Sequence, residues 1–139
     1  MKYTGVMKFK IGWGDCSPSG AVFYPNYFRW FDAGMWNFFD EAGWALKDLE
    51  NKFGIVGLPL IETHADFKKS CKLHDLIILE TKITAFSRKT LNMSHTLIKG
   101  DDVIIEAFDV RFWGIKHPEE PSRLKAALIP EEVTNYFDH

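Results

Sequence analysis

The segment from Phe23 to Trp44 is the feature that most constrains how this chain can fold. It holds ten of the aromatic residues of the chain, which number 12 Phe, 5 Trp and 4 Tyr. From Pro25 onward the large apolar residues recur every three or four positions, the spacing of one helix face, and proline is well tolerated in a first helical turn. The pattern predicts one long helix from Pro25 that ends at Gly43. Apolar residues also lie on its other side, so we expect other elements to enclose it.

Most of the remaining chain is predicted to form strands, because it is rich in β-branched and aromatic residues. Residues 45–57 predict a short irregular helix and a glycine-bearing loop, and Pro130 opens a short terminal helix. This order predicts an α+β domain over residues 1–139, in which a five-stranded antiparallel sheet wraps around one long central helix. That arrangement is the hotdog fold. The expected strands cover residues 6–13, 60–68, 75–86, 89–99 and 102–114, with a hairpin turn at 99–102.

The last predicted strand has two different faces, of which one is expected to pack and the other to be partly exposed. A sheet of five strands around one helix also leaves open edges and an uncovered surface. Pairing with a second copy into a longer sheet would cover one edge, so we expect at least a homodimer. The two faces of the last strand are Ile104, Phe108, Val110 and Phe112 on one side, and Ile105, Ala107, Asp109 and Arg111 on the other.

Charge and composition exclude several classes of function. The net charge of −2 offers no basic excess for binding nucleic acid. No window approaches 18 apolar residues, so we expect no membrane span, and lysines within the first ten residues argue against a signal peptide. We therefore expect a cytoplasmic protein whose two cysteines, Cys16 and Cys71, are free thiols. The histidines and cysteines lack the close spacing of a metal site, so no metal is predicted.

The turn before the long helix is the stretch most indicative of chemistry. Residues 14–20 supply turn formers in a row, and the first backbone N–H groups of the helix that follows have no partner within it. These N–H groups carry the positive end of the helix dipole, which can polarise a thioester carbonyl and stabilise the oxyanion formed on it. The same residues would also suit an ordinary turn without function.

Residues 14–33 read GDCSPSGAVFYPNYFRWFDA and closely resemble the signature of the bacterial 4-hydroxybenzoyl-CoA thioesterase family. The similarity continues through residues 54–59, 79–81 and 87–90 into the terminal helix. The resemblance implies a hotdog dimer, usually paired again into a homotetramer, with active sites at the dimer interface. It implies an acyl-CoA substrate, with coenzyme A as part of the substrate and no separate cofactor. It also implies that the backbone N–H of Tyr24 donates a hydrogen bond to the thioester carbonyl, while the Tyr24 ring packs.

The resemblance further implies a catalytic aspartate at the second acidic position of a D-x-D-x-x-G pattern, which here begins at Asp15 and has Ser17 at that position. Three interpretations follow. In the first, Ser17 hydrogen-bonds the attacking water, and Asp15, His64 or Asp32 takes the proton of that water. In the second, Ser17 is itself acylated, with His64 as the base and with Asp66 or Asp15 orienting the His64 ring. In the third interpretation catalysis has been lost, and the protein only binds acyl-CoA.

Arg88, Lys89 and Thr90 lie between two predicted strands. Three polar residues are what any solvated turn would carry, but the matched motif favours a role in which Arg88 and Lys89 hold the phosphates of coenzyme A. A second basic cluster could meet the nucleotide in the same way, although its residues are better explained as an exposed strand end. This cluster consists of Lys68, Lys69 and Lys72.

Asp32 is unusual because a carboxylate on a mostly enclosed helix needs a partner. Arg29, an arginine of a second subunit, or a polar group of the acyl chain would each serve. Trp36, one turn further on, is a candidate for lining the acyl pocket, and core packing is an equal alternative. His64 is the histidine singled out above, and ordinary strand packing is the alternative for it.

Together these features predict a cytoplasmic acyl-CoA thioesterase that binds an aromatic or short acyl group at a subunit interface. The main rival is a hotdog protein that binds acyl-CoA without hydrolysing it. A hotdog dehydratase is disfavoured, since it would usually need a histidine in the turn or the helix, and none is there.

Overall fold

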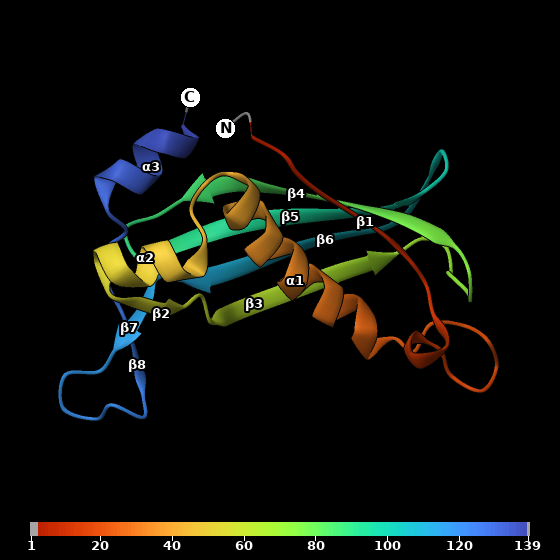
Figure 1. Ribbon diagram of the computed structural model, residues 1–139, viewed down its shortest axis with the longest axis horizontal. Helices are drawn as coiled ribbons and strands as arrows, with labels where there is room; N and C mark the ends of the chain where they lie inside the picture. The colour runs from red at the N-terminus through yellow and green to blue at the C-terminus, as the bar shows by residue number, and fades with distance from the viewer. Residues whose placement is uncertain (1–2, 139) are drawn as a thin grey trace.

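The computed structural model describes residues 3–138, so the first two residues and the last residue of the expected 1–139 domain lie outside the described part. The elements follow one another in the order drawn in Figure 1. They are β1 (Gly5–Lys10), a 3₁₀ turn (Trp13–Asp15), α1 (Pro25–Glu41), α2 (Leu46–Phe53), β2 (Ile55–Gly57), β3 (Leu60–Phe67), β4 (Leu76–Phe86), β5 (Thr90–Lys99), β6 (Asp102–Phe112), β7 (Gly114–Lys116), β8 (Leu124–Ala126) and α3 (Glu131–Phe137).

The main sheet has five antiparallel strands in the order β1-β4-β5-β6-β3. The long helix α1 lies across one face of this sheet (Figure 1). The predicted sheet and long helix are therefore present, and α1 begins at the predicted Pro25. No helix within residues 3–138 is both long and apolar enough to cross a bilayer.

Two stretches differ from the prediction. The first strand ends at Lys10, because residues 13–15 turn into a 3₁₀ helix. The stretch predicted as a loop before Pro59 is instead strand β2, which pairs with β7, and β7 pairs with β8 in a second sheet of three strands. Each of these strands has only three residues, too few to show an alternating pattern in the sequence.

The core lies between α1 and the sheet. Seven residues of α1 are buried, among them Phe31, Phe38 and Phe39, each no more than 1% exposed. Burying a side chain of this kind contributes roughly 1.5–3 kcal/mol. The helix is less enclosed than predicted, since Arg29, Asp32, Ala33 and Asp40 are exposed.

On β6, the packed face is the one that carries Asp109 and Arg111. Both residues are buried, as are Ile105 and Ala107, whereas Phe108 on the opposite face is 40% exposed. The face of β6 with the charged side chains therefore points to α1. The desolvation of these charges must then be offset by hydrogen bonds and ion pairs with neighbouring side chains.

The two edges of the main sheet differ. Along β1, the Val6 N–H donates to Glu41 Oε2 at 3.3 Å, and the Val6 carbonyl accepts a hydrogen bond from Asn37 Nδ2 at 3.2 Å. Side chains from the end of α1 thus cover this edge at Val6. Strand β3 pairs only with β6 within residues 3–138, and seven of its eight residues are exposed.

Candidate active site

The turn before α1 is held closed by backbone hydrogen bonds. Ser17 N donates to the Ala21 carbonyl at 2.8 Å, and Gly20 N donates to the Ser17 carbonyl at 2.9 Å. Gly20 has a φ of 89°, a conformation that glycine adopts without steric cost. The loop is further attached to α1, because Asn26 Nδ2 donates to the Asp15 carbonyl at 2.9 Å. The local sequence therefore fixes the turn against the first residues of the helix.

The start of α1 presents a free backbone donor. Tyr24 is the residue before the first helical position, and no side chain caps the helix there. Asn26 N and Tyr27 N are satisfied by the carbonyls of Phe23 and Tyr24. Within the described residues, the N–H of Tyr24 has no hydrogen-bond partner. This N–H lies at the positive end of the helix dipole, where an anion or a polarised carbonyl oxygen is stabilised.

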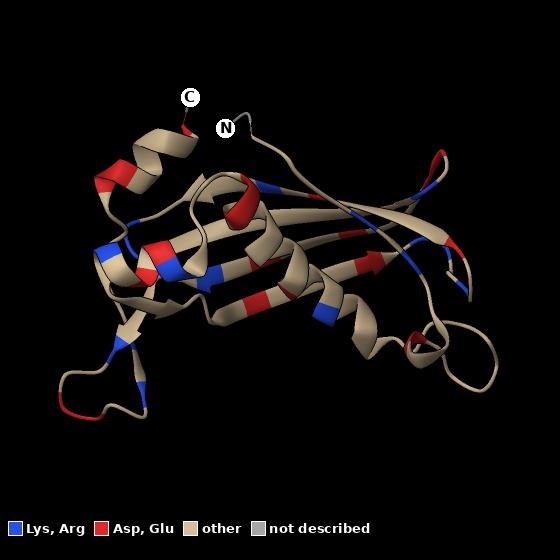
Figure 2. Cartoon of the chain, in the orientation of Figure 1, with Lys and Arg blue, Asp and Glu red and all other residues tan. Residues whose placement is uncertain are grey.

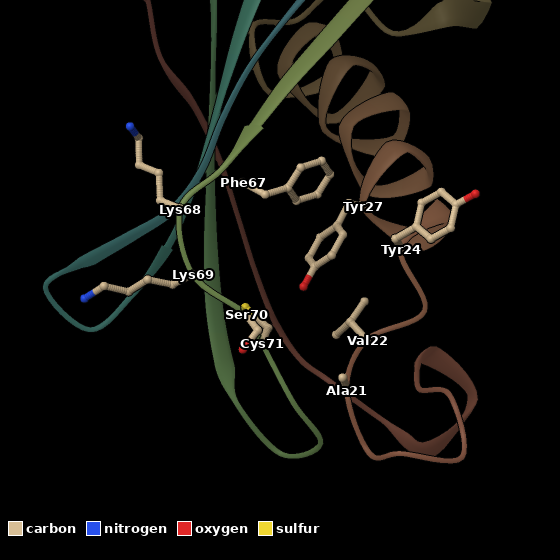
Figure 3. A pocket seen from close by; sticks show the side chains of 9 residues that line it. All are labelled: Ala21, Val22, Tyr24, Tyr27, Phe67, Lys68, Lys69, Ser70 and Cys71. Atoms are coloured by element: carbon tan, nitrogen blue, oxygen red, sulfur yellow. The ribbon is translucent and has the colours of Figure 1, made fainter.

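A cavity of about 460 Å³ lies beside this donor, between the start of α1 and the segment that follows β3. Its walls include Val22, Tyr24, Tyr27, Phe67 and Cys71 (Figure 3). The rings of Tyr27 and Phe67 meet edge to face with centroids 5.6 Å apart. Burial raises the pKa of Tyr27 from 10.0 to about 12, with a smaller contribution from Cys71. The cavity thus has several apolar walls, and the Tyr27 hydroxyl at its wall stays protonated well above neutral pH.

Ser17 lies in the turn without contact to an acid. Its Oγ is 2.8 Å from the Oγ of Ser19 and donates to the Ala21 carbonyl at 3.3 Å. The Asp15 carboxylate is used elsewhere: Oδ2 accepts the Gly12 N–H at 2.9 Å, and Oδ1 is 3.4 Å from Arg29. Among the described residues, no side chain is placed to take a proton directly from Ser17 Oγ.

His64 is not brought to the turn within one chain. It lies on β3 opposite Phe108 in the register, and its ring stacks on that phenylalanine with centroids 5.4 Å apart. Phe108 is on the outer face of the sheet, so His64 also points away from α1. Asp66 bonds Lys68 at 3.2 Å. A triad of Ser17, His64 and an aspartate is therefore not assembled in the single chain.

Asp32 finds a partner that the sequence analysis does not name. Its Oδ1 accepts a hydrogen bond from Arg111 at 2.9 Å, whereas Arg29 contacts Asp15 instead. Of the partners considered for Asp32, Arg29 is therefore not the one that it contacts within the described residues. Trp36 follows one turn later, half-buried, with its ring 6.3 Å from that of Phe39. Along the axis, Asp32 and Trp36 are about 12 and 18 Å from Tyr24.

Behind Asp32, buried polar side chains form a continuous hydrogen-bonded chain that sequence reasoning missed. Arg111 donates to Asp109, whose Oδ2 is 2.7 Å from His95 Nε2, and His95 Nδ1 is 3.1 Å from Thr81 Oγ1. Burial raises the pKa of Asp109, but the hydrogen bond and charge of His95 and the charge of Arg111 outweigh it and leave this pKa below its usual value. The only sequence signal was the alternation that places Asp109 and Arg111 on one face of a strand.

Arg88, Lys89 and Thr90 lie at the opposite end of the sheet from the turn of Ser17. Arg88 and Lys89 lie in the connection between β4 and β5, and Thr90 is the first residue of β5. A hydrogen bond from Ser87 N to the Thr90 carbonyl at 2.8 Å closes this turn. The length of β4, 11 residues, separates the two ends by roughly 35 Å. One chain therefore does not bring these residues to the start of α1.

The basic side chains differ in their availability. Within residues 3–138, Arg88 and Lys89 take part in no ion pair, whereas Lys68 pairs with Asp66 and Lys69 pairs with Asp102. Lys68 and Lys69 are among the residues that line the cavity, although their ammonium groups point away from it in Figure 3. Figure 2 shows that further basic residues, on β7 and β8, lie at the same end of the sheet as Arg88. Across the described part of the chain, no three His, Cys, Asp or Glu side chains gather as they would around a metal ion.

Comparison with known proteins relates nearly the whole chain to one family. Residues 11–137 match the family model of the thioesterase-like superfamily. The chain is 33% identical over 134 residues to the 4-hydroxybenzoyl-CoA thioesterase of Pseudomonas sp. (strain CBS-3), a match that covers 91% of this chain and 92% of that protein.

Solved structures give the same relationship. The crystal structure of an aspartate-to-asparagine variant of 4-hydroxybenzoyl-CoA thioesterase, in complex with 4-hydroxybenzoyl-CoA, is similar with a TM-score of 0.88 and 28% identity, over 97% of this chain and 99% of that one. A gentisyl-coenzyme A thioesterase is similar with a TM-score of 0.80 and 29% identity, over 96% and 99%. These similarities confirm the predicted hotdog fold.

Proposed function

Because the chain belongs to the thioesterase-like superfamily, we propose that it hydrolyses acyl-CoA thioesters whose acyl group is aromatic or short. The observation that carries the proposal is the N–H of Tyr24 at the start of α1, which has no hydrogen-bond partner within residues 3–138 and lies beside a cavity of about 460 Å³. The named substrates of the relatives, 4-hydroxybenzoyl-CoA and gentisyl-CoA, support an aromatic acyl group.

In this proposal the thioester carbonyl oxygen accepts a hydrogen bond from Tyr24 N–H. Water attacks the carbonyl carbon and gives a tetrahedral oxyanion on the same donor. The C–S bond then breaks, the thiolate of coenzyme A takes up a proton, and the free acid is released. One donor aimed at an oxyanion contributes about 2.7–4 kcal/mol to lowering the barrier in enzymes where it has been removed.

Ser17 would hydrogen-bond the attacking water, since its Oγ is exposed enough to reach solvent and lies in the turn beside the helix start. Of the three candidates for the proton acceptor, Asp15 is the one in the same loop as Ser17. His64 lies on the other face of the sheet, and Asp32 is held by Arg111 at 2.9 Å. We therefore assign proton acceptance to Asp15.

A second subunit would complete the site. We infer that β3 pairs with β3 of a second copy about a twofold axis, which makes the two strands antiparallel. The start of α1 in one chain would then lie at the same end of the joined sheet as Arg88, Lys89 and Thr90 of the other. Free of internal ion pairs, Arg88 and Lys89 would hold the phosphates of coenzyme A. We further propose that two such dimers pair into a homotetramer. We also propose a cytoplasmic location for the protein.

Thiol release from a panel of benzoyl-type and short-chain acyl-CoAs tests the activity. We expect turnover by the wild-type chain and a loss of at least about tenfold in kcat for Ser17→Ala, because water would lose a hydrogen-bond partner in the transition state. Asp15→Asn should reduce kcat as well, and His64→Gln should not. Ser122→Ala, in an exposed loop far from the turn, is the matched control. Full activity of Ser17→Ala would contradict the role of Ser17.

One observation favours a second candidate function, a protein that binds acyl-CoA without hydrolysing it. The Asp15 carboxylate is engaged by Gly12 and Arg29, which leaves Ser17 without a neighbouring base. Tight binding of acyl-CoA by the wild-type chain without thiol release, together with release by Ser17→Asp, would identify this alternative.

A further inference from the structure

We propose that Arg111 is a positioning residue of the acyl site: supported by Asp109 and His95, it fixes Asp32 so that one carboxylate oxygen accepts a hydrogen bond from a hydroxyl group on the acyl part of the substrate. The inference rests on the proposed acyl-CoA substrate and adds the residues that set the choice of acyl group. It concerns a buried network that makes no contact with the turn of Ser17 among the described residues.

The network crosses a core that is otherwise apolar. It runs from Thr81 on β4 through His95 on β5 to Asp109 and Arg111 on β6, and it ends at Asp32 on α1. The first four residues are each no more than 2% exposed. Asp109 is also held by Thr63 Oγ1 at 2.9 Å. Four strands of the sheet, β3 to β6, are thus connected to one position on the helix.

Arg111 is the branching point of this network. Its Nε and one terminal nitrogen donate to Asp109 Oδ2 at 3.2 and 3.0 Å, and its other terminal nitrogen donates to Asp32 Oδ1 at 2.9 Å and to the Leu58 carbonyl at 3.0 Å. The guanidinium group is planar and rigid, so contacts on one side determine where the other side points. Asp109 therefore orients Arg111, and Arg111 orients Asp32.

Stability alone does not account for such a network. Replacing a buried ion pair by well-packed apolar residues is often neutral or even stabilising, since the desolvation of both charges costs about as much as their attraction gains. Apolar side chains fill the rest of this layer, among them Phe31, whose ring stacks on that of His95. A polar connection that leads to a half-exposed carboxylate points to a use at that carboxylate.

Asp32 offers a specific kind of binding group. Its side chain is 54% exposed, and among the described residues its second oxygen, Oδ2, accepts no hydrogen bond. Phe28 and Trp36 lie one turn before and after it on the same helix face, which supplies apolar walls. An ionised carboxylate only accepts hydrogen bonds, so this site favours an acyl group with a hydroxyl and penalises one that leaves the charge unpaired.

Kinetics with matched esters test the proposal. For the wild-type chain, kcat/KM for 4-hydroxybenzoyl-CoA should exceed that for benzoyl-CoA by at least about tenfold, the usual effect of a hydrogen bond to a charged group. Asp32→Ala should remove this preference, and Arg111→Lys should reduce it at least about fivefold, mainly through KM. Because the two residues act as one unit, the double variant should match Asp32→Ala. If Arg111→Lys lowers kcat/KM by the same factor for both esters, the role of Arg111 is merely structural and the proposal is overturned. The same holds if the losses in kcat/KM of the two single variants multiply in the double variant.

Two further variants keep the test decisive. If Arg111→Lys does not fold, Asp109→Asn preserves shape, removes the charge that orients Arg111, and should lower the preference in the same direction. Arg123→Lys, an exposed arginine paired with Glu120, is the matched control and should keep the wild-type ratio. An unchanged ratio in folded Asp109→Asn would overturn the proposal.

The two proposals can fail separately. Absence of thiol release from every ester would overturn hydrolysis, and the same comparison is then made with dissociation constants for the two esters. A wild-type chain that prefers neither ester, in rate or in binding, would overturn the role of the Arg111 network while hydrolysis stands. Binding of neither ester would overturn both.

Discussion

The phenol of Tyr27, at the wall of the cavity beside α1, makes a residue-scale prediction about pH. Because burial raises its pKa from 10.0 to about 12, the folded chain holds this proton more tightly than the unfolded chain. The resulting stabilisation is complete below pH 10 and is lost as the pH rises toward 12, by at most about 1.4 kcal/mol per pH unit. Denaturant unfolding between pH 9 and 11.5 should show this slope, and Tyr27→Phe should reduce it. The exposed Tyr24, as Tyr24→Phe, is the control. An unaltered slope in Tyr27→Phe would contradict the assignment.

At the scale of elements, the packing of α1 on β1 depends on a close approach at Gly5. A Cβ atom at this position would lie 2.9 Å from Cα of Phe38, a backbone atom that cannot move without the helix. Gly5→Ala should therefore lower the free energy of unfolding by roughly 1–3 kcal/mol, as overpacking of a core does. Urea denaturation measures this change. Gly14→Ala is the control, since nothing lies within 4 Å of its added atom; similar stabilities for the two variants would refute the packing argument.

How far the sequence predicts these elements depends on the range of the interactions that form them. The helix from Pro25 and the strands of the main sheet carry long repeating patterns, and those predictions are confirmed. Strand β2 was missed because its partner β7 lies about sixty residues away and both are too short for a pattern. The network of His95, Asp109 and Arg111 was missed for a related reason: strand register brings these side chains together, and a charged strand face resembles an exposed one in the sequence.

At the scale of the whole molecule, the open β3 edge predicts how copies assemble. Ile61 is 56% exposed on this edge, and a lysine on an edge strand opposes pairing with another strand. We expect the wild-type chain to sediment as a dimer or tetramer and Ile61→Lys to sediment as a monomer with reduced thiol release. Val6→Lys, on the covered β1 edge, should assemble normally. A monomeric wild-type chain, or an Ile61→Lys variant that still assembles, would argue against pairing through β3.

If copies pair through β3, the side chains of Asn37 and Glu41 at the β1 edge would oppose further growth of the joined sheet. A layer of strands with both borders available can add copies without end, as fibrils do. Because these side chains occupy the outward hydrogen-bonding groups of Val6 on β1, we expect copies to join only at β3, so that the joined sheet ends after two copies. The same few polar atoms would thus protect the molecule from polymerisation while leaving free the border at which a shared pocket can form.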